Sequence, residues 1–417
     1  MTLKLKNGRL PDGTRTDVLI EDGRIAAVGE NLPDGSRTVE LEGAVLSPGF
    51  VDAHVHLRDP GQTHKEDILT GTAAAAAGGF TDVCCMPNTT PACDSPQTVR
   101  YVLEKAAQGS ARVHPVAALT KGLAGKELCD YEALWQAGAR FFSDDGKPLA
   151  DKALFETALR RVTALGGILM SHCEALSIID GGIINKGAVS ERLGVRGMDR
   201  RSEDSVTQQE CEIAAASGGR LHICHVSTKG SIEILRRAKA ACGTITCETG
   251  PHYFSLTDEA LLSRNADFRM NPPLREEADR RAILQAVLDG TIDLIATDHA
   301  PHSEQEKRDF VHAPNGIVGL ETAFAVSYTY LVKPGYMSLR ALLSRMSETP
   351  RRVLGLPERR IEPGQPADLC AVSEGAWTVE RDKLHSKGKN TPYHGQTLYG
   401  KVILTLLDGR ITYQENQ

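Results

Sequence analysis

The sequence predicts an α/β protein, namely a (β/α)8 (TIM) barrel with a small discontinuous β-sandwich domain built from both chain ends. In the middle of the 417-residue chain, short apolar segments alternate with helical segments, and eight βα units of this length form a closed parallel barrel. Near both ends, the pattern changes to short strands separated by turn residues. An open doubly wound sheet is the alternative, but no Gly-x-Gly-x-x-Gly follows a predicted strand, which argues against its dinucleotide-binding version.

The two chain ends carry the strands of the small domain. The N-terminal stretch alternates apolar and polar side chains, as in Leu3-Lys4-Leu5-Lys6, and is too short for a stable sheet of its own. Near the C-terminus strands return, and the turn Asp408-Gly409 closes the last hairpin. We therefore expect residues 1–48 and 357–417 to form the β-sandwich and residues 49–356 to form the barrel.

The barrel elements are expected where apolar runs alternate with helical patterns. The eight strands are predicted at 46–56, 81–87, 113–119, 139–144, 168–172, 221–226, 244–248 and 294–298. The helices are predicted at 70–78, 97–108, 152–165, 205–216, 231–241 and 278–288. Several helices end in paired glycines, such as Gly166-Gly167, which is the usual signal for a helix end.

Composition excludes several classes of partner. The net charge is −6 with both signs interspersed, and without a basic patch the chain is not expected to bind nucleic acid. No apolar run reaches the about 20 residues that span a bilayer, and residues 1–8 lack the apolar core of a signal peptide. The ten cysteines lie in apolar runs without a Cys-x-x-Cys pair, so we interpret them as reduced thiols of a cytoplasmic protein.

The first chemical signal is the strand that contains His54, His56 and Arg58. Side chains alternate along a strand, so these three residues should share one face. Two imidazoles at this spacing can chelate one metal ion, and Zn²⁺ prefers such ligands. Arg58 could bind a substrate carboxylate through two parallel hydrogen bonds. A lone His-x-His pair is more often structural, so the metal hypothesis requires further ligands.

Polar side chains also follow the other predicted strands, and catalytic residues of a barrel lie at these C-terminal strand ends. The candidates are Asn88, Asp144, Asp145, His172, His225, Asp298 and His302. His222 and His225 have opposite parity, so we prefer His225, nearer the strand end, as the ligand and interpret His222 as a supporting residue. Six further histidines do not lie at the end of a predicted strand with other polar residues, and we interpret them as structural: His64, His114, His252, His312, His385 and His394.

Taken together, these motifs resemble those of the dihydroorotase family, in its long bacterial form within the amidohydrolase superfamily. The resemblance covers nearly the whole chain, including the closing Ile361-Glu362-Pro363-Gly364. The motifs that carry it are His54-x-His56-x-Arg58, Met86-Pro87-Asn88-Thr89, Asp144-Asp145-Gly146, His172-Cys173-Glu174, His225-Val226-Ser227-Thr228, Asn271-Pro272-Pro273-Leu274-Arg275 and Ala296-Thr297-Asp298-His299-Ala300-Pro301-His302.

The resemblance implies two zinc ions per subunit and a set of substrate contacts. The implied metal ligands are His54, His56 and Asp298 for the first ion and His172 and His225 for the second. An acidic residue would bridge the ions: Asp145 fits the motif, with Asp144 as the competing candidate, whereas many relatives use a carboxylated lysine. The implied substrate-binding residues are Arg58, Asn88 and His302 at the carboxylate and Asn271, Asn315 and Gly316 at the pyrimidine ring.

The implied reaction is the reversible closure of N-carbamoyl-L-aspartate to L-dihydroorotate in de novo pyrimidine biosynthesis, with Asp298 as the acid–base residue. One alternative is a hydantoinase or allantoinase, which usually has a bridging lysine and lacks the Arg58–Asn88 clamp. Another is a catalytically silent scaffold relative, but such proteins usually lose ligands that this chain retains. The family further implies a homodimer, and some relatives associate with aspartate transcarbamoylase. The charged loop 301–314 is a candidate lid.

Overall fold

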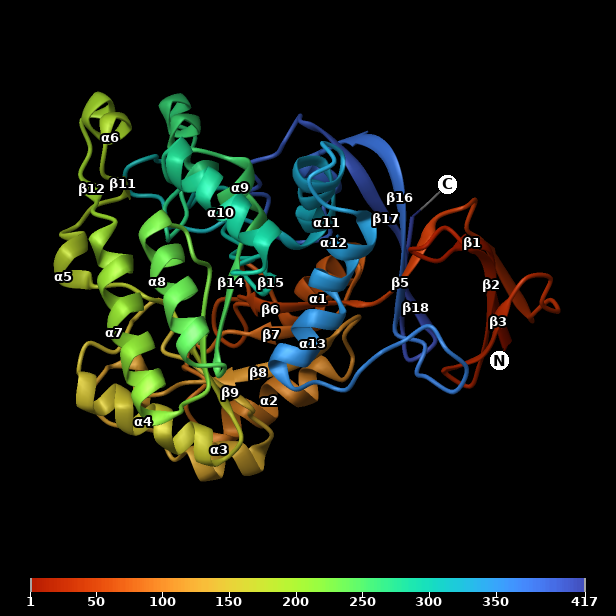
Figure 1. Ribbon diagram of the computed structural model, residues 1–417, viewed down its shortest axis with the longest axis horizontal. Coiled ribbons are helices and arrows are strands. Elements are labelled where there is room, and N and C mark those ends of the chain that lie inside the picture. The colour runs from red at the N-terminus through yellow and green to blue at the C-terminus, as the bar shows by residue number, and fades with distance from the viewer. Residues whose placement is uncertain (1, 416–417) are drawn as a thin grey trace.

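The computed structural model describes residues 2–415 and shows the two expected parts, a barrel and a smaller sheet (Figure 1). In the figure the barrel lies on the left and the sheet on the right. Both ends of the described chain run into the sheet, as the sequence predicted.

Eight parallel strands form the barrel. They are β6 (Phe50–Val55), β7 (Phe80–Cys85), β8 (Arg112–Ala117), β9 (Phe141–Phe142), β10 (Ile168–Ser171), β13 (Leu221–Ile223), β14 (Ile245–Thr249) and β15 (Leu294–Ile295). Each strand pairs with its neighbour in this order, and a parallel bridge between Val55 and His299 closes the circle. At this closure the amide of His56 donates to the carbonyl of His299 over 2.8 Å. The predicted barrel is confirmed, because an open doubly wound sheet would leave two free edges.

Helices surround these strands, and most of them connect one strand to the next. The longer ones are α1 (Ile68–Ala77), α2 (Pro96–Ala106), α3 (Tyr131–Ala137), α4 (Lys152–Ala164), α7 (Arg201–Ser217), α8 (Lys229–Ala241), α10 (Glu277–Asp289), α12 (Leu339–Met346) and α13 (Glu348–Leu354). The shorter elements are α5 (Leu176–Ile179), α6 (Ala188–Leu193), α9 (Pro251–Ser255) and α11 (Ala323–Ser327), with the small strand pair β11 (Ile184–Asn185) and β12 (Gly197–Met198). The excursion that contains α5, β11, α6 and β12 was not among the elements predicted from the sequence.

Short polar side chains define where several helices begin. Asp67 accepts hydrogen bonds from the first free amides of α1, Asp151 does so for α4, and Thr228 does so for α8. These side chains satisfy amides that have no partner within the helix. Thr228 lies five residues after the end of β13, on the segment that leaves the barrel mouth. Its cap therefore fixes the start of α8 near that mouth.

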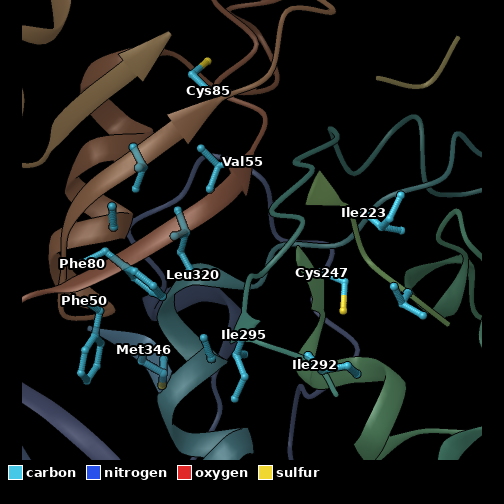
Figure 2. Packing of buried hydrophobic residues seen from close by; sticks show 14 of the residues in the cluster. Phe50, Val55, Phe80, Cys85, Ile223, Cys247, Ile292, Ile295, Leu320 and Met346 are labelled. Atoms are coloured by element: carbon cyan, nitrogen blue, oxygen red, sulfur yellow. The ribbon is translucent and has the colours of Figure 1, made fainter. Parts of the chain in front are cut away.

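A large apolar core lies between the barrel strands and the surrounding helices (Figure 2). The rings of Phe50 and Phe80 meet edge to face with centroids 5.8 Å apart, and Phe50 stacks on Phe324 at 5.9 Å. Leu320 and Met346 belong to the same buried cluster. Burial of large side chains of this kind stabilises the folded state by about 1.5–3 kcal/mol each. This core therefore supports the polar residues at the carboxyl ends of the barrel strands.

The two chain ends share one sheet. Its strands are β1 (Thr2–Arg9), β2 (Arg15–Glu21), β3 (Arg24–Gly29), β4 (Arg37–Glu40), β5 (Val45–Pro48), β16 (Leu369–Thr378), β17 (Thr397–Leu407) and β18 (Arg410–Gln414). The order is β18-β17-β16-β5-β1-β2-β3, with β4 paired to β1. The antiparallel pair β5–β16 joins the two ends of the chain, and residues from both ends enclose a separate apolar core. The layers of the expected sandwich are thus parts of one continuous sheet.

Ion pairs to two buried aspartates connect this sheet to the barrel. Arg112 on β8 lies 3.2 Å from Asp82 on β7 and 3.2 Å from Asp368, just before β16. Arg351 on α13 lies 2.6 Å from the other oxygen of Asp82, and Arg359 lies 2.6 Å from Asp368. Since one arginine binds carboxylates of both parts, the network holds the sheet in a defined position on the barrel.

Two further expectations concern cysteine and membranes. All ten cysteines are free thiols, and nine of them are buried. Within residues 2–415, no helix has the length and apolar character needed to cross a membrane.

Candidate active site at the barrel mouth

The six side chains expected to hold metal converge at the carboxyl ends of the barrel strands. His54 lies in β6, and the other five follow the ends of strands: His56, Asp145, His172, His225 and Asp298. Ligand atoms of His54, His56 and Asp145 lie within 4.8 Å of one another, and the same holds for Asp145, His172 and His225. Asp145 belongs to both groups, which is the position that a shared ligand between two cations requires.

Distances place Asp298 beside the first group. Its Oδ1 lies 3.1 Å from Nε2 of His56 and 3.6 Å from Nε2 of His54. Oδ1 of Asp145 lies 3.4 Å from Nε2 of His54 and 3.7 Å from Nε2 of His225. The carboxylates therefore stand between imidazoles rather than beside a lysine or arginine.

The central atoms of this cluster are buried without hydrogen-bond partners. They are Nε2 of His54 and Oδ1 of Asp145, which lie 3.4 Å apart. An unsatisfied buried polar group costs about 1–3 kcal/mol, so a cation that binds these atoms would stabilise the fold. Neutral imidazole and carboxylate are ligands that Zn²⁺ prefers, and the donor set thus fits the metal that the family implies.

The electrostatics of the two carboxylates support the same conclusion. Burial alone would raise the pKa of Asp145, but the charge of His54 and contacts with His225 outweigh it and hold that pKa well below its usual value. Burial opposes the shift at Asp298 too, yet the hydrogen bond from His56 and the charge of His54 lower its pKa. Both groups are therefore ionised at neutral pH.

Asp144 lies outside the cluster. Its carboxylate accepts hydrogen bonds from the amides of Leu119 and Thr120, at 2.8 and 3.0 Å, and from the hydroxyl of Thr120. These partners occupy the carboxylate and tie the end of β9 to the turn after β8. Of the two adjacent aspartates that the sequence left open, the geometry favours Asp145 as the shared ligand.

Three expected site residues have a left-handed backbone. The φ angles are +58° at Arg58, +35° at His225 and +48° at Asp298. This conformation is strained for residues other than glycine, by about 1–3 kcal/mol, and it turns the side chain out of the regular strand alternation. For this reason β13 and β15 end earlier than the sequence predicted, and strand parity alone could not have placed His225 or Asp298.

Carboxylates behind the histidines orient the rings. Glu248 in β14 lies 3.3 Å from Nδ1 of His54 and 3.1 Å from Nε2 of His222. Nδ1 of His222 also bonds the hydroxyl of Thr246. His222 is therefore a supporting residue, as the parity argument suggested. Sequence reasoning did not assign Glu248, although a carboxylate at the end of the seventh predicted strand was a signal for it.

Glu174 and Asn271 flank the second group. Glu174 lies 3.3 Å from Nε2 of His172 and accepts a hydrogen bond from Nδ2 of Asn271 at 2.8 Å. Burial lowers the pKa of His172, but the charge of Glu174 outweighs it and raises that pKa to about 9. Oδ1 of Asn271 is buried without a partner, so it remains as an acceptor. Glu174 is a second supporting carboxylate whose role the sequence did not reveal.

Asn88 contacts two of the expected metal ligands directly. Its Oδ1 lies 2.8 Å from Nδ1 of His56, and its Nδ2 donates to Oδ2 of Asp145 at 3.1 Å. The amide therefore orients two expected ligands. The sequence predicted Asn88 as a carboxylate binder, and the structure adds this orienting contact.

Arg58 and His302 lie together next to the cluster. Nε of Arg58 donates to the carbonyl of Pro301 at 3.2 Å, and its Nη2 lies 3.3 Å from Nε2 of His302. Nε2 of His302 is 2.9 Å from the carbonyl of Asn315, which can only accept, so the proton lies on Nε2. Burial and the charge of Arg58 lower the pKa of His302 to about 2, so its ring is neutral. Two cations lie at this corner: Arg58, and Lys65, whose Nζ is 3.4 Å from Nδ1 of His302.

The turn that contains Asn315 and Gly316 lies against His302 and forms one side of the candidate site. The side chain of Asn315 accepts a hydrogen bond from Arg269 at 3.1 Å, so its amide is directed at Arg269, while its carbonyl faces His302. The amide of Gly316 donates to the carbonyl of Arg269 at 3.0 Å. Both residues lie beside His302, and they contribute through the backbone.

Comparison with known proteins agrees with these motifs. A family model described as Dihydro-orotase-like matches residues 43–231, and one described as Amidohydrolase family matches residues 188–412. The dihydroorotase of Syntrophus aciditrophicus is 43% identical, with 100% of both chains covered. The dihydroorotase of Geobacter metallireducens is also 43% identical, over 99% of this chain and 100% of the relative. The chain belongs to the dihydroorotase family. It is therefore an enzyme of the cyclic amidohydrolase type.

Solved structures of other amidohydrolases share the fold of this dihydroorotase-family chain. The L-hydantoinase (dihydropyrimidinase) from Arthrobacter aurescens matches with a TM-score of 0.88 and 24% identity, over 100% of this chain and 96% of that one. The dihydropyrimidinase from Brevibacillus agri matches with a TM-score of 0.86 and 22% identity, with the same coverage. At this identity the likeness establishes the barrel with its attached sheet and carries no information on substrate.

Proposed function

We propose that the protein is a dihydroorotase, which reversibly closes N-carbamoyl-L-aspartate to L-dihydroorotate in de novo pyrimidine biosynthesis. Full-length similarity to proteins of that name supports the proposal. The observation that carries it in the structure is the position of Arg58, a buried cation next to the His–Asp cluster. Both forms of the substrate carry a carboxylate, so one arginine can orient the reactant in either direction.

The proposal includes two zinc ions per subunit. The proposed ligands are His54, His56 and Asp298 for one ion, His172 and His225 for the other, and Asp145 for both. The unpaired buried atoms of the cluster and its donor types support this assignment. When bound, zinc would supply the Lewis acidity that activates water and polarises an amide carbonyl.

Asp298 is the proposed acid–base residue. Its lowered pKa makes it an ionised proton acceptor in the ring-opening direction. There the carboxylate would take a proton from the attacking water and deliver it to the leaving ring nitrogen. In the ring-closing direction the same carboxyl group must begin protonated, so the two directions have opposite pH preferences.

Other side chains would hold the substrate in place. Arg58 would bind the carboxylate, with neutral His302 packed beside it. The unpaired Oδ1 of Asn271 would accept a hydrogen bond from a ring N–H, because Glu174 already fixes the Nδ2 side of that amide. These contacts require an anionic cyclic amide and select against a neutral one.

Turnover of three cyclic amides tests the proposal. Zinc-loaded protein should open dihydroorotate and close carbamoyl aspartate, whereas dihydrouracil, which lacks the carboxylate, should be a poor substrate. Equal or faster opening of dihydrouracil or hydantoin would support the hydantoinase alternative. Absence of any turnover at full metal content would support the silent scaffold.

Assembly and location form a separate part of the proposal. The family resemblance implies a homodimer and a possible complex with aspartate transcarbamoylase. A cytoplasmic location is supported by the ten free cysteines, because reducing compartments keep thiols unpaired. Light scattering on the purified protein, with and without an added transcarbamoylase, would test both assemblies.

A further inference from the structure

Lys307 lies in the loop that the sequence suggested as a lid, and its side chain is buried. Its Nζ donates to the carbonyl oxygens of Arg269, Pro314 and Gly316, at 3.2, 3.0 and 3.0 Å. Three carbonyl acceptors match the three protons of an ammonium group. Lysine is rarely buried without such partners, and through them Lys307 joins Arg269 to the turn that contains Pro314 and Gly316.

Asn390 reaches the same region from the C-terminal part of the chain. Its Nδ2 donates to the carbonyls of Ala300 at 3.2 Å and Gly316 at 2.9 Å, and its Oδ1 accepts from the amide of His302 at 3.1 Å. The segment that carries Asn390 is itself anchored on the barrel, because Glu66 accepts hydrogen bonds from Ser386 and from the amide of the next residue.

The two side chains meet on the carbonyl oxygen of Gly316. A Cβ at Gly316 would lie 2.7 Å from the carbonyl oxygen of Ala300 and 3.0 Å from Nε2 of His302, so the turn packs directly against that ring. The carbonyl of Pro301, which binds Arg58, lies between Ala300 and His302, whose backbone groups bind Asn390. The backbone that contacts Arg58 and His302 is thus fixed by Lys307 and Asn390.

We propose that Lys307 and Asn390 are positioning residues for carboxylate recognition, fixing segments 300–302 and 314–316 so that Arg58 and His302 face the substrate in one orientation. The inference rests on the proposed function, because the ring carboxylate of dihydroorotate is the group recognised. Both residues act through backbone groups at the carboxylate corner, so their loss weakens substrate binding more than the chemical step. The loop after β15 is then a fixed wall of the site, and the C-terminal segment takes part in specificity.

The test compares Lys307→Met and Asn390→Ala with the parent and with Lys4→Met. Lys4 is a control far from the barrel mouth, because it is another buried lysine that donates to a carbonyl, that of Leu32, although it also lies 3.3 Å from Asp17 and from Asp34. KM and kcat are measured with dihydroorotate, the Kd of orotate by calorimetry and zinc by elemental analysis. We expect KM and Kd to rise roughly tenfold in both site variants, the value of about one hydrogen bond that orients a charged group. The kcat and zinc content should stay close to the parent, and Lys307→Arg should recover part of the binding.

Hydrogen exchange supplies a readout that does not depend on substrate. The amides of Gly316 and Val318 donate to the carbonyls of Arg269 and Asn390, and their exchange should accelerate in Lys307→Met and Asn390→Ala but not in Lys4→Met. Unchanged KM, Kd and exchange would overturn the positioning role. A parallel loss of kcat and zinc would also overturn it, because the residues would then support the whole site. A parent that fails to open dihydroorotate refutes the proposed function, whereas a normal parent with unaltered variants refutes only this inference.

Discussion

At the residue scale, Asp298 occupies a position where metal binding and proton transfer meet. Its carboxylate contacts both histidines of the first group, and its backbone is held in the left-handed region that aims it into the barrel mouth. Strain of this kind persists only where surrounding contacts enforce it. The chemistry of the site therefore depends on single side chains whose loss leaves the core untouched.

Asp298→Asn should fold normally and lose most activity. Asparagine has nearly the same shape but cannot accept a proton, and general acid–base catalysis contributes about 10²–10⁴-fold. Circular dichroism would check the fold and steady-state kinetics the loss. Near-normal turnover by the metal-loaded variant would remove Asp298 from the proton-transfer step.

Asp145→Ala should lower metal content, because a shared carboxylate offsets the repulsion between two divalent cations. Two variants serve as controls. Lys147→Ala should keep its metal and activity, since Lys147 follows Gly146 beyond the strand end. Asp144→Asn should weaken the fold, because the hydroxyl of Thr120 loses the carboxylate oxygen that accepts its hydrogen bond. Zinc per chain measured on all three decides the assignment, and metal loss in Lys147→Ala with Asp145→Ala intact would point to a carboxylated lysine.

At the element scale, the ends of the strands determine which side chains reach the site. β14 illustrates this, because Glu248 stays inside the regular strand and contacts the rings of His54 and His222 from behind. By contrast, His225 and Asp298 lie beyond the ends of β13 and β15, where the backbone leaves the strand conformation. Glu248 and His222 thus support the site from within strands, whereas Glu174 and most of the expected ligands lie just after strand ends.

Glu248→Gln should weaken metal binding without abolishing it. The carboxylate fixes the ring of His54, and loss of a group of this kind typically costs about 10–100-fold in metal affinity. Zinc dissociation in the presence of a chelator would measure the change. Asp279→Asn is the control, because Asp279 is a buried carboxylate on α10 whose partners are Arg200 and the amide of Lys229. Equal zinc affinity in both variants would exclude an orienting role for Glu248.

At the scale of the whole molecule, the sheet and the barrel are coupled by charges. Burial would raise the pKa of Asp82, but the hydrogen bond from His114 and the charges of Arg351 and Arg112 outweigh it and lower that pKa. A carboxyl group whose pKa is depressed in the folded state contributes stability above its unfolded pKa of about 4, and this stability is lost as pH falls. The connection between the two parts should therefore be sensitive to acid.

Asp82→Asn should be less stable than the parent at pH 7 by about 3–5 kcal/mol, because two arginines lose a buried partner. The difference should shrink progressively below about pH 4, as the parent carboxylate becomes protonated. Denaturant unfolding at pH 7, 5 and 3 would measure it, with Asp382→Asn, an exposed aspartate, as control. A difference that does not depend on pH would show that the charge of Asp82 does not stabilise the fold.

The sequence by itself determined the barrel, the pairing of the chain ends and the family, because these depend on local features. Apolar runs of strand length, helix caps and turns are read within a few residues, and the pairing of His54 with His56 needs only the alternation of one strand. Local reading also marked the strand ends as the place of the polar candidates, whereas the resemblance to the family supplied the set of six expected metal ligands.

Only the tertiary structure decided the remaining questions, because they depend on contacts between distant segments and on irregular backbone. Asp145 and Asp144 are adjacent in sequence, and bonds from Thr120 separate their roles. The left-handed backbone at His225 and Asp298 breaks the alternation on which strand reasoning relies. Asn390 lies 88 residues from His302 in sequence, yet it binds its amide, and no local pattern records a contact of that range.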